Sequence, residues 1–102
     1  DMEFTTTDKG LIRSEMACLL YDPDNGAILH VHRVVTMKGA EEWPAEAIEE
    51  RARKLATDFG LEAGRLKSLI VDGKKLKPEK DYRVDPKKQR LVSSKRDGLM
   101  AA

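Results

Sequence analysis

The sequence contains few of the residues on which most active sites and covalent cross-links depend. Among 102 residues there are one cysteine, Cys18, and two histidines, His30 and His32, and aromatic residues make up 5% of the chain. A single cysteine cannot close a disulfide within the chain. No apolar run approaches the roughly 20 residues of a membrane-spanning helix, and residues 1–15 lack the apolar core of an export signal. We therefore expect a cytoplasmic protein with no membrane role.

The charge is nearly balanced overall but is unevenly distributed along the chain. The formal net charge is +1, and the length fits a single domain. Residues 1–64 hold seven basic and 13 acidic residues, a net charge of −6, whereas residues 65–102 hold 12 basic and five acidic residues, a net charge of +7. This division indicates either attraction between the two halves, within a chain or between subunits, or contact of the basic part with an external polyanion.

A β-hairpin is the clearest local prediction. Two apolar runs flank residues 22–26, Asp-Pro-Asp-Asn-Gly, where proline fixes φ and Asn-Gly tolerates positive φ. We expect strands over about residues 15–21 and 27–36, with Asp22 opposite Ala27. This register also places Leu20 opposite Leu29 and Cys18 opposite Val31. Because side chains alternate across a strand, one face then carries Met16, Cys18, Leu20, Leu29 and Val31, and the other carries Ala17, Leu19, Tyr21, Ile28, His30, His32 and Val34.

The rest of the chain predicts one helix and further short strands. After Pro44, apolar residues recur at helical spacing up to Gly60, namely Ile48, Ala52, Leu55, Ala56 and Phe59. Trp43, just before this helix, is expected to pack against Ala47 or Ile48. Strands are expected over 66–71, 81–85 and 90–92. The fold class is therefore α+β, a small antiparallel sheet of four to five strands in the order β-β-α-β-β-β, packed on one amphipathic helix.

We divide the chain into three parts. Residues 1–14 form an N-terminal segment, either an edge strand around residues 4–7 or a remnant added to the native chain. Residues 15–92 form the single α+β domain. Residues 93–102, which are rich in Ser, Lys, Arg and Gly, form a flexible tail.

The second face of the hairpin is the candidate interface. A single helix covers only one face of the hairpin, and the other mixes apolar groups with tyrosine and histidine, which is typical of an interface or a ligand groove. Its residues are Leu19, Tyr21, Ile28, His30, His32 and Val34. We expect a non-enzymatic protein-interaction module, a homodimer through this face or a complex with another protein. Cover by the N-terminal segment or the tail is the alternative.

Catalytic and metal sites are not expected. The predicted register puts Cys18 and the histidines on opposite faces, so no Cys–His dyad forms, and no serine lies in a nucleophile elbow. His30 and His32 have the spacing of metal ligands, but a metal site needs three or four donors. We therefore expect no enzyme activity and no cofactor, with a small-ligand or metal site at the histidines as an alternative.

Basic residues in the last third of the chain give the other alternative, nucleic-acid or polyanion binding. The loops around Lys77 and Lys88 are expected to be neighbours at one end of the sheet. Only Tyr82 is available nearby for base stacking, and lysines also protect sheet edges from pairing, so we do not favour this function. The residues of the cationic cluster are Lys74, Lys75, Lys77, Lys87, Lys88 and Arg90.

Overall fold

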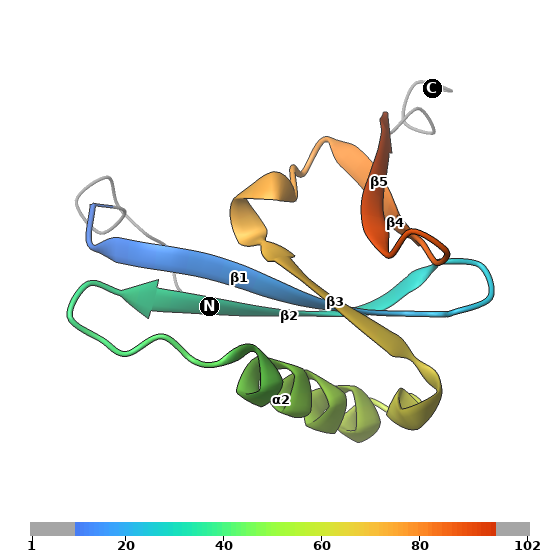
Figure 1. Cartoon of the computed structure of the whole chain (residues 1–102), viewed down its shortest axis with the longest axis horizontal. Helices are drawn as coiled ribbons and strands as arrows, with labels where there is room; N and C mark the ends of the chain where they lie inside the picture. Colours follow the sequence, from blue (N-terminus) through green and yellow to red (C-terminus); the bar gives the residue numbers. More distant parts are fainter. Residues whose placement is uncertain (1–9, 96–102) are drawn as a thin grey trace.

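The computed structural model describes residues 10–95 of the chain (Figure 1). The elements are β1 (Ile12–Tyr21), β2 (Ile28–Met37), α2 (Ala45–Asp58), the 3-10 helix η1 (Ala63–Arg65), β3 (Lys67–Asp72), the 3-10 helix η2 (Gly73–Lys75), β4 (Lys80–Asp85) and β5 (Arg90–Lys95). The α+β class with one helix is confirmed. The expected single sheet is wrong, because the five strands form two antiparallel sheets, β2-β1-β3 and β4-β5. The expected order also omitted both 3-10 helices.

The boundaries of the domain differ from those expected. β1 begins at Ile12, inside the segment assigned to residues 1–14, and β5 runs through Lys95, past the expected start of the tail. The edge strand expected around residues 4–7 lies outside the described residues. Among the residues that are described, no helix is long and apolar enough to cross a membrane.

The turn between β1 and β2 forms as its residues predict. The Asp22 amide N–H donates to the Ala27 carbonyl oxygen at 2.9 Å, and the Gly26 N–H donates to the Asp22 carbonyl oxygen at 2.8 Å. The side-chain oxygens of Asp22 and Asn25 each accept a hydrogen bond from the backbone two residues further on. Gly26 has φ of +77°, which only glycine adopts without strain.

The expected register is wrong beyond this turn, because the hairpin contains a β-bulge. Tyr21 pairs with Ile28, but the next pair is Leu20 with His30, so Leu29 has no partner opposite it. The shift continues along the hairpin: Cys18 pairs with His32 rather than Val31. A bulge adds one residue to one strand, and a shift of one residue moves every later side chain to the opposite face.

The face of the sheet toward α2 holds one part of the core. Cys18 and Leu20 pack there with the helix residues Ile48, Ala52 and Ala56, so the predicted helical stripe is largely confirmed. Its last member is not, since Phe59 is 76% exposed at the end of the helix. Trp43 is 52% exposed, so about half of its surface is left unpacked before the helix.

The opposite face of the sheet is covered by the C-terminal third of the chain. The side chains of Ala17, Leu19 and Tyr21 are buried there together with Val84 of β4. Figure 1 shows the resulting layers, with α2 on one side of the three-stranded sheet and the β4–β5 hairpin on the other. The face of the hairpin that carries Leu19 and Tyr21 is thus buried by a second sheet of the same chain. From the sequence, we expect a partner copy to cover this face.

Candidate functional site

The structure divides the six residues of the predicted interface between two faces. Leu19, Tyr21 and Ile28 belong to the core between the two sheets. The bulge turns His30, His32 and Val34 toward α2: they stand opposite Leu20, Cys18 and Met16, and Val34 packs against the helix-side core. The six residues therefore do not form one continuous surface, and no feature of the sequence indicates the bulge that separates them.

The bulge also brings Cys18 and His32 together as a cross-strand pair, so the prediction that they lie on opposite faces is wrong. Burial, and then the negative charge of Glu49, raise the pKa of Cys18 to about 11, although Arg53 opposes this shift. Burial, and then the charges of His30 and Arg51, lower the pKa of His32. A catalytic thiolate–imidazolium pair needs the opposite shifts, so burial and the neighbouring charges disfavour that ion pair here.

The histidines have no third metal ligand in the described part of the chain. No group of three or more His, Cys, Asp or Glu side chains with metal-binding geometry occurs within residues 10–95. The ring of His30 instead lies 5.9 Å from the ring of Phe59, between centroids, and its buried Nε2 atom has no hydrogen-bond partner. This arrangement is that of a packed side chain rather than of a metal ligand.

The cationic cluster is divided between the two ends of β4. Lys74 and Lys75 lie in η2, and Lys77 precedes the start of the strand, whereas the turn after Asp85 carries Lys87 and Lys88. Six residues of strand separate these ends by roughly 17 Å. The Asp85 carboxylate accepts hydrogen bonds from the backbone of Lys88 and Lys87, which lower its pKa. The expectation that the two loops are neighbours is therefore wrong.

The three-stranded sheet has two outer strands, β2 and β3, and within residues 10–95 neither has a hydrogen-bonded strand on its outer side. β3 has six residues and carries a lysine and an aspartate at its ends, whereas β2 has ten residues. Seven consecutive residues, 30–36, are in regular register with β1 between its two irregularities. The whole strand, Ile-Leu-His-Val-His-Arg-Val-Val-Thr-Met, contains no proline, lysine, aspartate or glutamate. Of the features that usually guard an exposed edge, it has one charged side chain, Arg33, and the bulge at Leu29 near its start.

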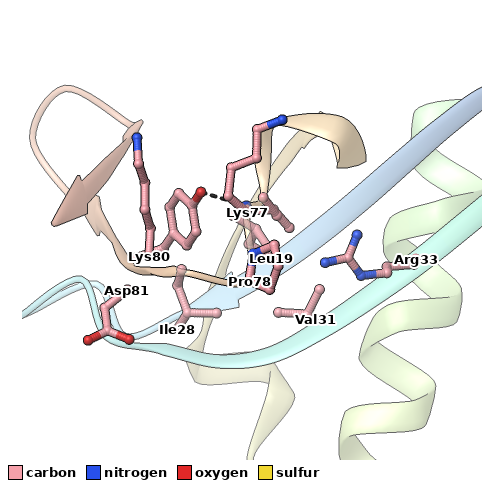
Figure 2. Close-up of a pocket in the computed structure, with 10 residues that line it drawn as sticks. Leu19, Ile28, Val31, Arg33, Lys77, Pro78, Lys80 and Asp81 are labelled. Carbon is pink, nitrogen blue, oxygen red and sulfur yellow. Dashed lines mark hydrogen bonds between the residues drawn. The ribbon is translucent and has the colours of Figure 1, made fainter. Parts of the chain in front are cut away.

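A groove of about 360 Å³ runs beside this edge on the side of the β4–β5 hairpin. Figure 2 shows β1 and β2 as its floor and the segment before β4 as its wall. The floor is apolar, with the buried side chain of Leu19 at its base. Its lining residues are Leu19, Ile28, Val31, Arg33, Leu76, Lys77, Pro78, Lys80, Asp81 and Tyr82.

Hydrogen bonds fix the wall of the groove in place. The Tyr82 hydroxyl accepts a hydrogen bond from the Lys77 N–H at 2.6 Å and donates one to the Lys75 carbonyl oxygen at 2.9 Å. Arg33 Nη1 donates to the Gly73 carbonyl oxygen at 3.4 Å, which links β2 to η2. The wall of the groove is therefore held in place by hydrogen bonds within the chain.

The groove is lined by residues from both the predicted interface and the predicted cationic cluster, together with residues that belong to neither. Leu19 and Ile28 belong to the predicted interface and Lys77 to the cationic cluster, whereas Arg33 and Pro78 were not singled out. The Leu76–Asp81 side of the groove reaches β2 only because η2 turns the chain across the sheet. No local pattern of the sequence encodes this contact.

A larger hollow, of about 560 Å³, lies at the other side of the β1–β2 turn. It is bounded by Pro23 and Leu29 on one side and by the segment 60–66 on the other. Its charged residues are of both signs, since Asp22, Asp24 and Glu62 face it together with Arg65. Of its lining residues only Leu29, at the bulge, belongs to a strand, so the hollow adjoins no regular strand edge.

The open edge of β2 and the groove beside it together form a surface suited to an extended polypeptide segment. The edge offers main-chain donors and acceptors, and the groove offers apolar contact with cationic side chains at its margin. Comparison of this chain with protein-family models, with curated proteins and with solved structures found no significant match.

Proposed function

We propose that this protein is a protein-interaction module that binds an extended strand of a second polypeptide chain at the open edge of β2. The single observation that carries this proposal is the ten-residue edge strand, which has no hydrogen-bonded neighbour on its outer side within residues 10–95 and contains neither proline nor lysine. Addition of a strand to an exposed edge is a recurrent mode of peptide recognition, in which main-chain hydrogen bonds supply affinity and side-chain pockets supply specificity.

The position of β2 supports this mode of binding. The strand is held on its inner side by β1, whose residues 17–21 are buried, so β2 is already ordered before a partner binds. Most of the conformational entropy lost on binding is therefore that of the partner strand. The groove beside Val31 supplies the side-chain contact that main-chain pairing alone does not provide.

A homodimer, which we expected from the sequence, is one form of this contact. Two copies would pair β2 with β2 about a two-fold axis. Nucleic-acid binding is less well supported, because the lysines at the two ends of β4 do not form one patch.

Selection of displayed random octapeptides on the immobilised protein tests the proposal. We expect enriched peptides to bind the purified protein and the variant Val35→Lys to weaken that binding about tenfold or more, because lysine on an edge strand opposes further pairing. Glu15 stands opposite Val35, so the new ammonium group has a carboxylate nearby and the fold should be retained. Urea unfolding checks that retention.

The matched control is Trp43→Lys, which introduces the same charge at an exposed apolar residue outside every strand. It should leave peptide binding unchanged. A dimer in sedimentation that Val35→Lys dissociates would also support binding at this edge. A monomer that enriches no peptide, or peptides whose binding is equal in wild type and Val35→Lys, would contradict it.

A further inference from the structure

We infer that the strand bound by β2 is acidic, and that it carries a carboxylate two positions before an apolar residue. This inference rests on the function proposed above and names the chemistry of the partner. It is carried by the groove on one side of β2, where Val31 and Arg33 face the same space two residues apart. The partner is thus an extended segment of another protein rather than a second copy of this chain.

The spacing follows from strand geometry. Val31 and Arg33 lie within the regular part of β2, so both side chains leave the sheet on the same face. A residue placed directly opposite on an added strand has its Cβ about 5 Å away and points to that same face. In antiparallel pairing, the more stable arrangement, the partner residue opposite Arg33 precedes the residue opposite Val31 by two positions.

Val31 and its surroundings select the apolar member of the pair. Val31 is 41% exposed although it borders an apolar floor made by Leu19 and Ile28. Pro78 closes the opposite side of the groove, as Figure 2 shows. The volume of about 360 Å³ lies within the range of ligand sites, roughly 300–1,000 Å³, and leaves room for an apolar side chain of the partner.

Arg33 selects the acidic member of the pair. Its guanidinium has five N–H donors, of which the Nη1 group is used by the bond to the Gly73 carbonyl oxygen, and this bond holds the group at the margin of the groove (Figure 2). Guanidinium is suited to paired hydrogen bonds with a carboxylate. Lys77 adds a second positive charge on the facing wall, and Lys80 and Asp81 add one charge of each sign, so the lining is net positive and favours an anionic partner.

A second copy of the chain cannot supply this chemistry through the same strand. β2 has no aspartate or glutamate, so pairing of two β2 strands offers no carboxylate from that strand to either Arg33. A register centred near Arg33 would bring two guanidinium groups together, and like charges across an interface oppose association. The charge of the edge therefore favours an acidic segment from a different protein.

Fluorescence anisotropy with labelled octapeptides tests this inference. The probe is a peptide of threonine and serine with one glutamate placed two positions before a leucine. A second peptide of identical composition has the glutamate adjacent to the leucine, so that the two side chains point to opposite faces. We expect the first peptide to bind at least about tenfold more tightly than the second, and this preference to decrease at high salt.

Charge reversal identifies the groups responsible. Arg33→Glu should weaken binding of the first peptide about tenfold and should favour a version with lysine in place of glutamate. The matched control is Lys88→Glu, which makes the same change of charge in the turn at the far end of β4 and should have no effect. Urea unfolding of each variant shows that the fold is intact.

The outcomes separate this inference from the proposed function. Equal binding of the two peptides, or binding that Arg33→Glu does not change, overturns the inference; if Val35→Lys still abolishes that binding, the proposed function stands. A dimer formed through β2 likewise overturns the inference and supports the proposed function. If no displayed peptide binds at the edge and the protein is a monomer, both fail.

Discussion

At the scale of single residues, Gly26 couples the β1–β2 turn to the second sheet. Its φ of +77° closes the turn, and its carbonyl oxygen accepts a hydrogen bond from the Val84 N–H at 2.9 Å. A Cβ at position 26 would overlap the Val84 carbonyl oxygen. One residue thus sets both the shape of the turn and the closeness of β4 to the end of the sheet.

The variant Gly26→Ala is expected to lower the free energy of unfolding by about 2–4 kcal/mol, because backbone strain and a backbone clash are combined. Urea unfolding measures the change. Gly39→Ala is the control: Gly39 also has positive φ, +89°, but a Cβ there meets no atom within 4 Å, so its cost should be about 1–2 kcal/mol. Equal losses in the two variants would show that the Val84 contact is unimportant.

His32 makes stability depend on pH. Its pKa is lowered from the ordinary value of 6.5 by burial and then by the charges of His30 and Arg51, so the unfolded chain binds the proton before the folded chain does. Stability is therefore complete above pH 6.5 and decreases as the pH falls through 6.5 toward the lowered pKa. We expect the urea concentration at the unfolding midpoint to decrease as the pH is lowered from about 7.5 to about 5.5. The decrease should be smaller in His32→Gln. An identical pH dependence in that variant would refute the role of His32.

At the scale of elements, the sequence predicts what local chemistry determines and misses what distant contacts determine. The turn at 22–26 and the helix after Pro44 follow from residues that act within a few positions, and both are present. The bulge at Leu29 does not, since a one-residue insertion leaves the apolar pattern of Ile28–Met37 unchanged. The second sheet forms because η2 carries β4 across the face containing Leu19, where stacking buries that face.

Arg53 illustrates how one side chain joins elements. Its Nη1 donates to the Ala63 carbonyl oxygen at 2.6 Å and to the Leu66 carbonyl oxygen at 2.9 Å, and its Nε donates to Glu49 at 2.9 Å. These bonds connect α2 to η1 and to the residue before β3. Neither carbonyl contact is visible in the sequence, which shows only the helical pair with Glu49.

Arg53→Met is expected to lower the free energy of unfolding by about 2 kcal/mol, since two partly buried carbonyl groups lose their charged donor. Arg65→Met is the control, because Arg65 makes a largely exposed pair with Glu62 at 3.6 Å and such pairs contribute under about 1 kcal/mol. Chemical denaturation compares the two. A loss in Arg53→Met no larger than that in Arg65→Met would contradict this role.

At the scale of the whole molecule, the fold buries both faces of the three-stranded sheet, and within residues 10–95 β2 is the longer of the two edge strands that no further strand covers. α2 covers one face and the β4–β5 hairpin covers the other, so the faces require no partner. β2 remains as an outer strand, with the groove beside it. The candidate site therefore arises from the layering itself, which explains why single motifs in the sequence did not reveal it.

Amide hydrogen exchange of the protein, measured with and without the octapeptide that has glutamate two positions before leucine, tests whether a polypeptide strand is added to the edge of β2. Because an added strand takes up the outward main-chain groups of the edge, we predict slower exchange of amides within Ile28–Met37, with no change in the turn that carries Lys88. Protection confined to the hollow between Pro23 and residues 60–66, or unchanged exchange throughout β2 at saturating peptide, would contradict the account.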